Sequence, residues 1–171
     1  HQAVGSRIEV IFITGADFGA QRGPLISPDA YRDLFQPVHR RLCDWIHDHT
    51  PWKIFIHSCG GIRPLIEDII AAGFDALNPV QCSAEGMEPE KLKEDYGSRL
   101  TFWGGGVDTQ RTLPFSTPEE VYREVRERIS IFNRGGGFVF NAIHNIQTGT
   151  PVENVIAMID AIRDSFEKSS A

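Results

Sequence analysis

Short apolar runs alternate with longer amphipathic stretches about five times along the 171 residues of this chain. The apolar runs, rich in Ile, Val and Phe, are residues 8–13, 52–57, 74–78, 100–104 and 137–141. The first run is apolar at nearly every position, which is typical of a parallel strand buried on both faces. The stretches between and after the runs predict helices at 29–49, 64–72, 87–96, from 117 onward and 151–167. This alternation predicts an α/β fold with a parallel sheet.

Local signals support the expected helix boundaries. Ser27 followed by Pro28 offers an N-cap and a proline at the first helical position, and Pro51 ends the same stretch. Gly73 stands where a helix C-cap is expected. Thr117 begins a Thr-Pro-Glu-Glu segment, whose early carboxylates favour the positive end of a helix dipole.

Five strand–helix units can belong to a doubly wound open sheet or to part of a (β/α)₈ barrel. A complete barrel typically takes about 250 residues, so this chain is too short for one. The chain also begins with little sequence before its first buried strand. We therefore expect residues 1–171 to form a single-domain fragment, a partial TIM barrel with about five C-terminal βα units.

Composition argues against several classes of partner. Seventeen Lys and Arg against 23 Asp and Glu give a net charge of −6, and no basic run offers an electrostatic footprint for nucleic acid. No apolar run approaches the roughly 20 residues needed to cross a membrane, and three cysteines are too few for a disulfide framework. We expect a cytoplasmic protein with reduced thiols. Exposed sheet edges in an incomplete barrel predict that the fragment self-associates.

Polar residues concentrate where the expected strands end. In both candidate folds the active site lies at the carboxyl ends of the strands and in the loops that follow them. The residues collected by this rule are Asp17, Gln21, Arg22, His57, Ser58, Cys59, Gly60, Gly61, Asn78, Gln81, Asp108, Thr109, Gln110, Asn141, His144, Asn145 and Gln147.

The H-x-C arrangement of His57 and Cys59 carries the clearest chemical signal. Imidazole and thiolate are ligands that zinc prefers, and two side chains separated by one residue at a strand end can face one point. His144, after the last strand, is the best-placed third ligand. Such a set leaves one coordination position open, as catalytic zinc sites do. The alternative is a hydrogen-bonded rim histidine beside a small buried cysteine.

Other rim residues have weaker signals. Asp17 can accept hydrogen bonds from substrate N–H groups or act in proton transfer, or it can simply cap a turn. Arg22 can clamp a substrate carboxylate or lie free in solvent. The two triple-glycine segments, 104–106 and 135–137, match neither a dinucleotide fingerprint nor a Walker A loop, which argues against nucleotide binding. They can form tight turns at the strand ends, which we favour, or allow a ligand to approach the backbone closely.

Several blocks in a fixed order resemble the C-terminal part of the uroporphyrinogen decarboxylase superfamily, which includes the corrinoid and coenzyme M methyltransferases. The blocks are Gln21-Arg-Gly-Pro-Leu-Ile-Ser-Pro28, His57-Ser-Cys-Gly-Gly61, Leu77-Asn-Pro-Val-Gln81, Trp103-Gly-Gly-Gly-Val-Asp-Thr-Gln110 and His144-Asn-Ile-Gln147. The resemblance covers nearly the whole chain, and it implies a (β/α)₈ barrel without its N-terminal strands.

The superfamily contains two chemistries. The resemblance implies, for methyl-transferring members, an H-x-C pair and a later cysteine that hold zinc, which binds a thiol and lowers its pKa. His57 and Cys59 match the pair, and His144 stands in place of the later cysteine. For the decarboxylases the resemblance implies no metal, an aspartate that holds the pyrrole N–H groups, and a rim histidine that His144 matches.

We expect a zinc-dependent methyltransferase that works with a methylated corrinoid protein and a thiol or similar acceptor. His57, Cys59 and His144 are the expected zinc ligands, and Asp17 and His144 the expected catalytic residues. The expected substrate-binding residues are Gln21, Arg22, Asn78, Gln81, Asp108 and Gln147. The first alternative is a metal-free uroporphyrinogen decarboxylase-type lyase. The second is a non-catalytic domain that binds a tetrapyrrole or a corrinoid protein.

Overall fold

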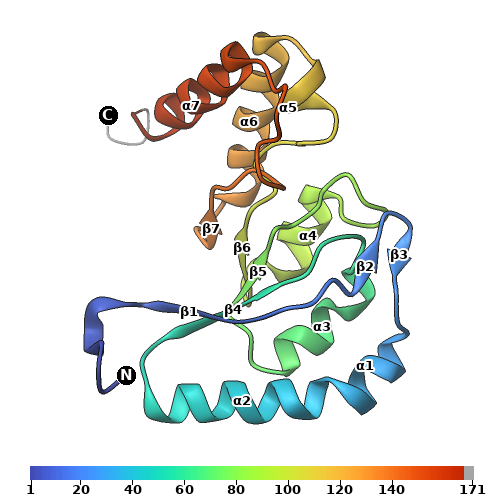
Figure 1. Cartoon of the computed structure of the whole chain (residues 1–171), viewed down its shortest axis with the longest axis vertical. Coiled ribbons are helices and arrows are strands. Elements are labelled where there is room, and N and C mark those ends of the chain that lie inside the picture. Colours follow the sequence, from blue (N-terminus) through green and yellow to red (C-terminus); the bar gives the residue numbers. More distant parts are fainter. Residues whose placement is uncertain (168–171) are drawn as a thin grey trace.

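The computed structural model describes residues 1–167, and its centre is a curved sheet of five parallel strands (Figure 1). The strand order is β1-β4-β5-β6-β7, so each strand pairs with the next one along the main sheet. The bounds are Val10–Gly15 (β1), Lys53–His57 (β4), Ala76–Asn78 (β5), Thr101–Trp103 (β6) and Phe138–Val139 (β7). The predicted α/β fold is confirmed, and the arrangement is that of a partial TIM barrel.

The helices lie along one side of the curved sheet (Figure 1). They are α1 (Pro28–Leu34), α2 (Gln36–His49), α3 (Arg63–Ala71), α4 (Pro89–Tyr96), α5 (Thr112–Phe115), α6 (Pro118–Phe132) and α7 (Val152–Glu167), after a 3-10 turn at Gly5–Arg7. Thr117 and Glu120 form the capping box of α6, which confirms the expected start of that helix. No described helix is both long enough and apolar enough to cross a membrane.

Strand alternation divides the sheet into two faces. In β4, Ile54 and Ile56 are fully buried against the helices, whereas Phe55 and His57 lie on the opposite, inner face and are partly exposed. Phe55 stacks on Trp103 of β6 with ring centroids 5.1 Å apart. The buried core therefore lies between sheet and helices, and the inner face carries an aromatic row and the polar residues at the strand ends.

The predicted single helix 29–49 is wrong, because the chain breaks into α1 and α2 at Phe35. Pro37 is the second residue of α2. A proline has no N–H to donate, and its ring clashes with the carbonyl four residues earlier, so a continuous helix through this point is disfavoured. Phe35 packs on Phe18 across the break, with ring centroids 5.0 Å apart.

Strand boundaries also differ from the prediction. The first strand runs over Val10–Gly15 instead of 8–13, because its partner β4 begins only at Lys53, which pairs with Val10. The last strand has two residues instead of five, since Gly137 before it has φ +69°, outside the extended region. A two-stranded antiparallel ribbon, β2 (Gly19–Ala20) and β3 (Gly23–Pro24), was not expected from the sequence.

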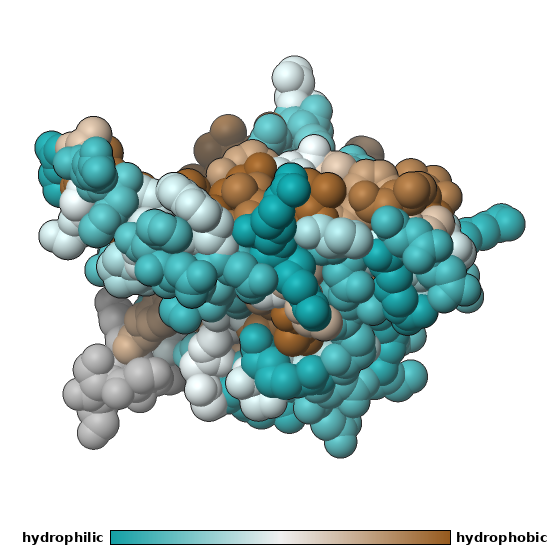
Figure 2. Space-filling view, turned by 90° about the horizontal axis from the view of Figure 1, so that it is seen from below, coloured by the Kyte–Doolittle hydropathy of each residue, from teal (hydrophilic) through white to brown (hydrophobic). Residues whose placement is uncertain are grey.

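Exposed apolar side chains gather on the helices at the two ends of the arc. Leu34, Val38, Leu42 and Trp45 are spaced along α1 and α2, and hydrophobic atoms are visible on the face that these helices form (Figure 2). A second row on α7 consists of Val152, Ile156, Ile159 and Phe166. Among the described residues, none of the large exposed hydrophobic side chains lies in α3, α4 or α6, which stand between the two ends, but Phe115 of the short helix α5 is 83% exposed. This distribution is what an open arc of a helical ring produces, and it agrees with the expected self-association, which stays a prediction.

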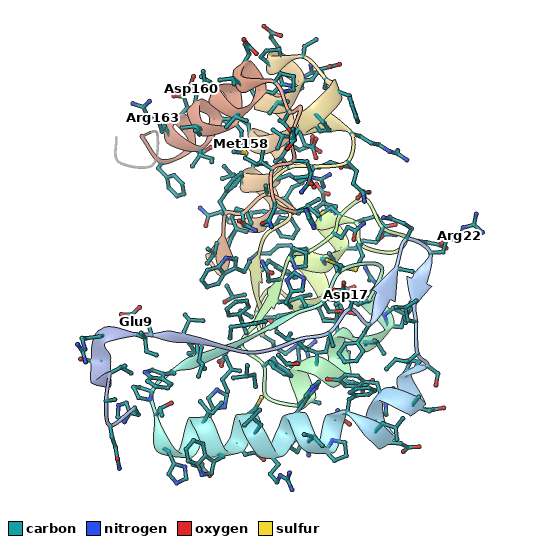
Figure 3. The ribbon with its side chains drawn as sticks, viewed as in Figure 1. Glu9, Asp17, Arg22, Met158, Asp160 and Arg163 are labelled. Atoms are coloured by element: carbon teal, nitrogen blue, oxygen red, sulfur yellow. The ribbon has the colours of Figure 1, made fainter. Side chains whose placement is uncertain are left out.

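Helix α7 packs against α6 and buries a second, smaller core. Met158 and Ala161 of α7 are buried with Val121 and Val125 of α6. Asp160 and Arg163 lie on the outer side of α7 (Figure 3). In the chain, α6 follows β6 and α7 follows β7. The loop that carries His144 connects β7 to α7.

Candidate metal centre

Parallel register brings three strand ends together. Gly15 of β1 pairs with His57 of β4, and His57 pairs with Asn78 of β5. Asp17 and Cys59 each lie two residues beyond the end of their strands. The loops after β1 and β4 therefore meet at one edge of the sheet, as the sequence predicts for the site.

Asp17, His57 and Cys59 form a compact cluster of potential metal ligands. Cys59 Sγ lies 3.5 Å from His57 Nε2, and Asp17 Oδ1 lies 3.7 Å from the same nitrogen. One ligand atom from each of the three residues lies within 4.8 Å of the other two. This is the one such group among residues 1–167. An imidazole nitrogen, a sulfur and a carboxylate oxygen thus face a common point.

Asn78 fixes the orientation of the His57 ring. Its Oδ1 lies 2.6 Å from His57 Nδ1, and its Nδ2 donates to the carbonyl of Trp103 at 2.8 Å. Because the Nδ2 group is the donor to Trp103, the oxygen accepts from His57, and the ring proton belongs on Nδ1. The lone pair of Nε2 then faces Cys59 and Asp17. Metal-binding histidines regularly donate their other ring N–H to an acceptor of this kind.

Hydrogen bonds from neighbouring loops hold the segment that carries Cys59. Asp17 Oδ1 accepts the Cys59 N–H at 2.9 Å, and Gln81 Oε1 accepts the Gly60 N–H at 2.9 Å. On the other side, Ser58 Oγ accepts the N–H of Phe18 at 2.9 Å. These bonds join loops from three successive strands, so the position of the Cys59 thiol is set by the fold rather than by a free loop.

The surroundings of Cys59 keep its thiol protonated. Burial raises the pKa of this thiol to about 11, and the charge of Asp17 and its hydrogen bond act in the same direction. No cation among the described residues is a source of a lowered pKa for this thiol. A thiolate here therefore requires an added positive charge, which a metal ion can supply.

A pocket of about 230 Å³ opens beside Cys59. The residues that line it are Cys59, Gln81, Thr109, Gln110, Ile143, His144 and Gln147. His144 is exposed, and its Nδ1 lies 3.3 Å from Gln147 Nε2. The predicted third ligand thus lies on the wall of the same pocket, but it is not part of the ligand cluster, where Asp17 stands instead. His144 as a zinc ligand and as a catalytic residue stays a prediction.

Of the other predicted site residues, some lie at the pocket and others do not. Gln21 Nε2 donates to Gln110 Oε1 at the pocket, over 3.3 Å. Arg22, at the tip of the β2–β3 ribbon, extends away from Asp17 (Figure 3). Asp108 is buried, and its Oδ1 accepts the backbone N–H groups of Gln110 and Arg111. Asp108 thus caps a turn with that oxygen, and Asn78 accepts a hydrogen bond from His57. Substrate binding by Gln21, Arg22, Asn78, Gln81, Asp108 and Gln147 stays a prediction.

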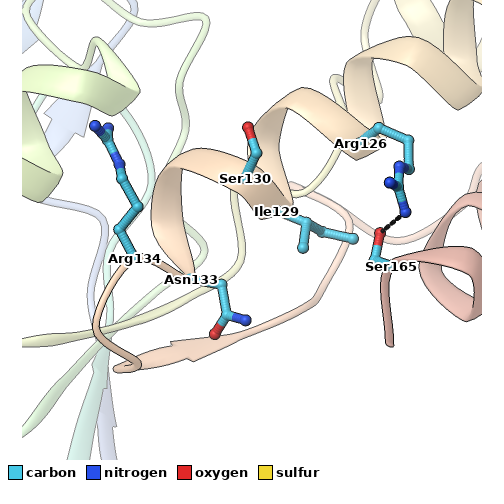
Figure 4. Close-up of a pocket in the computed structure, with 6 residues that line it drawn as sticks. All are labelled: Arg126, Ile129, Ser130, Asn133, Arg134 and Ser165. Carbon is cyan, nitrogen blue, oxygen red and sulfur yellow. Dashed lines mark hydrogen bonds between the residues drawn. The ribbon is translucent and has the colours of Figure 1, made fainter. Parts of the chain in front are cut away.

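A different pocket, of about 260 Å³, lies between α6 and α7 (Figure 4). Its polar side chains do not converge. Arg126 donates to Ser165 Oγ at 3.0 Å, while Arg134 extends away from that bond (Figure 4). This pocket shares no residue with the one beside Cys59, and the chemistry of the site does not involve it.

Sequence reasoning missed Asp17 as a potential ligand and Asn78 as the partner of His57. The only signal for either was its position after a strand end. Asn78 directly precedes Pro79, and Asp17 is separated from Cys59 by 42 positions. Their roles depend on strand order, which composition and periodicity leave open.

Comparison with known proteins agrees with this architecture. The family model described as uroporphyrinogen decarboxylase (URO-D) matches residues 10–165. A methyltransferase from Methanosarcina mazei has a similar solved structure, with a TM-score of 0.69 and 25% identity; the match covers 93% of this chain and 42% of that one.

Two curated relatives are named for different activities. A methylated-thiol–coenzyme M methyltransferase of Methanosarcina mazei is 29% identical over 141 residues, which are 82% of this chain and 35% of the relative. A uroporphyrinogen decarboxylase of an Azoarcus species is 27% identical over 154 residues, 87% of this chain and 40% of the relative. The chain therefore spans well under half the length of these relatives. The family model covers most of the chain, and the chain belongs to the uroporphyrinogen decarboxylase superfamily of enzymes.

Proposed function

We propose that this chain is part of a zinc-dependent methyltransferase that takes a methyl group from a corrinoid protein and passes it to a thiol or similar acceptor. The observation that carries the proposal is the convergence of His57 Nε2, Cys59 Sγ and an Asp17 carboxylate oxygen within 4.8 Å. A metal-free decarboxylase has no physical need for a thiol at this point. The methyltransferase relative in Methanosarcina mazei adds support.

The residues present fit a zinc ion. Nitrogen, sulfur and oxygen ligands in one cluster suit this metal, and the His57 Nδ1 proton is already engaged by Asn78. Three protein ligands leave an open position, as catalytic zinc sites require. The geometry favours Asp17 as the third ligand, and His144 on the same pocket wall is the second candidate.

Bound zinc would supply Lewis-acid chemistry, lowering the pKa of an acceptor thiol so that the thiolate is available at neutral pH. The residues of this chain hold the proposed ligand side chains in position. Cys59 must give up its proton when the metal binds, because the thiolate is the ligand. Asp17 holds the Cys59 backbone N–H, and Asn78 keeps the His57 ring turned toward the cluster.

A uroporphyrinogen decarboxylase is the second candidate. It is favoured by the similarity to several proteins with that name, among them those of Azoarcus and Coxiella burnetii. In this case His144, exposed on the pocket wall, would contact the porphyrinogen, and Cys59 would be a half-buried neutral thiol.

Metal analysis and a product assay separate the two. We expect the purified protein to contain about one zinc per chain, as a three-ligand site of this kind implies. We also expect it to demethylate a methylated corrinoid protein in the presence of a thiol. Absence of zinc together with release of carbon dioxide from a porphyrinogen would replace this proposal with the decarboxylase.

Asn78→Leu is expected to weaken zinc binding about 10- to 100-fold, the usual cost of losing the hydrogen-bond partner of a metal-binding histidine. The variant removes the acceptor for His57 Nδ1, so the ring is free to rotate. Competition with a chromogenic chelator measures the affinity. Asn133→Leu, which removes the same amide at the end of α6, should leave the affinity unchanged. Equal affinities of the Asn78 and Asn133 variants would contradict the role of Asn78.

A further inference from the structure

Two charged side chains lie on the face of α6 that packs into the protein. Val121, Val125 and Ile129 are buried at the spacing of one helix face, and Glu124 and Arg128 occupy positions between them on the same face. The Arg128 and Glu124 side chains are only 18% and 15% exposed, and Arg128 Nη2 lies 3.4 Å from Glu124 Oε1. Arg128 Nε is buried without a hydrogen-bond partner among the described residues. A buried ion pair that leaves such a group unsatisfied adds little to stability, so stability alone does not account for the pair.

Glu124 contacts the loop that follows β6. Its Oε1 accepts the backbone N–H of Asp108 at 3.1 Å, so one carboxylate oxygen faces both this loop and Arg128. Asp108 Oδ1 in turn accepts the N–H groups of Gln110 and Arg111 at 2.7 and 3.1 Å. A continuous series of hydrogen bonds therefore runs from α6 through Asp108 into the turn that precedes α5.

The same loop forms part of the wall of the pocket beside Cys59. Thr109 and Gln110 line this pocket together with Cys59. The carbonyl of Val107, in the same loop, accepts the N–H of Ile143, another lining residue, at 3.2 Å. The cluster of potential metal ligands, in contrast, lies on β4 and on the loops after β1 and β4. The pocket wall and the ligand cluster thus have separate supports.

We propose that Glu124, oriented by Arg128, is a positioning residue that holds the loop after β6, so that Thr109 and Gln110 form one wall of the pocket. The pair acts through the backbone of Asp108, and neither member lines the pocket. The use of this pocket by a methyl acceptor rests on the proposed function. The role of Glu124 in holding the loop rests only on the contacts described above.

Two variants separate positioning from stability. Glu124→Gln keeps an oxygen for the Asp108 N–H but leaves Arg128 buried without its anion, so it should lower stability in urea unfolding and keep the loop in place. Glu124→Leu/Arg128→Leu removes both charges and the acceptor, so it should retain stability and release the loop. A purely structural role predicts instead that stability and loop position change together.

Amide hydrogen exchange under native conditions, resolved by residue with NMR, reports the position of the loop. In the double leucine variant we expect the amides of Asp108, Gln110 and Arg111 to exchange about tenfold faster or more, because a hydrogen bond to a charged acceptor is lost. In Glu124→Gln the same amides should stay within about threefold of wild type, since the acceptor is retained. Glu124→Leu alone should match the double variant, so the comparison with glutamine remains decisive if the double variant fails to fold.

Alkylation of Cys59 by iodoacetamide reports the pocket wall itself. The protein is first treated with a chelator, and modification of the Cys59 peptide is followed by mass spectrometry at one pH. Release of the wall should raise the rate about threefold or more in the double leucine variant and leave it near wild type in Glu124→Gln. Asp160→Ala/Arg163→Ala removes an ion pair from the outer side of α7 and should change neither amide exchange nor alkylation (Figure 3).

Unchanged amide exchange in the double leucine variant would overturn the proposal, and so would equal acceleration in Glu124→Gln or an unaltered Cys59 alkylation rate once the loop is released. Zinc affinity tests the proposed function separately. Because the proposed ligands lie outside the loop after β6, both variants should bind zinc as the wild type does. A wild-type protein that binds no zinc would reject the methyltransferase, while the exchange and alkylation results would still decide the role of Glu124.

Discussion

Replacing Cys59 by serine is expected to lower the zinc affinity of this protein by about 100- to 1,000-fold. Structural zinc with four protein ligands is bound with about 10–16 kcal/mol, so each ligand contributes roughly 2.5–4 kcal/mol. Serine keeps the size of the side chain but presents a hydroxyl, which is a poor zinc ligand. The affinity is measured by competition with a chelator of known zinc affinity.

Cys82→Ala is the matched control, because Cys82 is also a free thiol but contacts the carbonyls of Val80 and Gly105 away from the cluster. Burial raises the pKa of the Cys82 thiol to about 12, so this residue should remain a neutral thiol. Similar losses of zinc affinity in the Cys59 and Cys82 variants would reject the assigned site.

The pH dependence of zinc binding provides a check on the same residue. The pKa of the Cys59 thiol is about 11, well above the assay range, so the metal must displace its proton. Zinc affinity should therefore rise by about tenfold per pH unit between about pH 6 and pH 8 on account of this thiol. The Cys59→Ser variant should lose that contribution.

The same assay decides the third ligand. The geometry favours Asp17, so Asp17→Asn should weaken zinc binding nearly as much as Cys59→Ser, while His144→Gln should have a small effect. The reverse order would restore His144 to the role that the sequence predicts. The His144 loop connects β7 and α7, and it would then have to move toward the cluster on metal binding.

The sequence was sufficient to predict the alternation of strands and helices and the edge of the sheet that carries the candidate site. Buried strands are apolar regardless of their neighbours, so Ile54 and Ile56 identify β4 without any tertiary information. The pairing of His57 with Asn78 was not predicted, because it depends on the register of β4 and β5 as well as on their order. The H-x-C spacing predicts that His57 and Cys59 face one point, and the structure places them in the cluster that we propose as the metal site.

Very short strands and contacts between residues far apart in the sequence could not be predicted from local patterns. The β2–β3 ribbon has two residues in each strand, too few for any alternation. The break at Phe35 shows that local apolar periodicity continues through Pro37, which is accommodated in the first turn of α2 but not in the interior of one continuous helix. Asp17 joins the cluster because the loop after β1 crosses toward Cys59, and a contact of this kind depends on how the backbone is packed there.

The close approach of the loop after β1 to the segment of Cys59 predicts a second large effect, a loss of stability when Gly60 is replaced. Gly60 has φ +86°, and a Cβ atom there would clash with the carbonyl carbon of Gly19 and lie 2.6 Å from the Ala20 nitrogen. The adjacent Gly61 N–H donates to the Ala20 carbonyl at 2.8 Å, so the two backbones are held together at this point. Gly60→Ala is expected to destabilise the protein by about 3 kcal/mol or more, combining roughly 1–2 kcal/mol for the left-handed backbone with the cost of a clash against main-chain atoms.

Two other glycines separate these contributions in urea unfolding experiments. Gly135 has φ +71°, and a Cβ atom there would have no atom within 4 Å, so Gly135→Ala should cost only the backbone term, about 1–2 kcal/mol. Gly19 lies on the other side of the crossing without a positive φ, and a Cβ atom there would lie 2.7 Å from both the Cys59 carbonyl oxygen and Ile62 Cγ2. Gly19→Ala should therefore cost the steric term, about 1–3 kcal/mol.

Zinc affinity links this packing to the metal centre. Gly19→Ala and Gly60→Ala both separate the loop that carries Asp17 from the loop that carries Cys59, so both should weaken zinc binding in the folded protein. Gly135→Ala lies at the opposite ends of the strands and should leave zinc binding intact. If Gly60→Ala were no more destabilising than Gly135→Ala, the two loops would have enough freedom to separate. The close approach of the backbones would then not be what holds Asp17 beside His57 and Cys59.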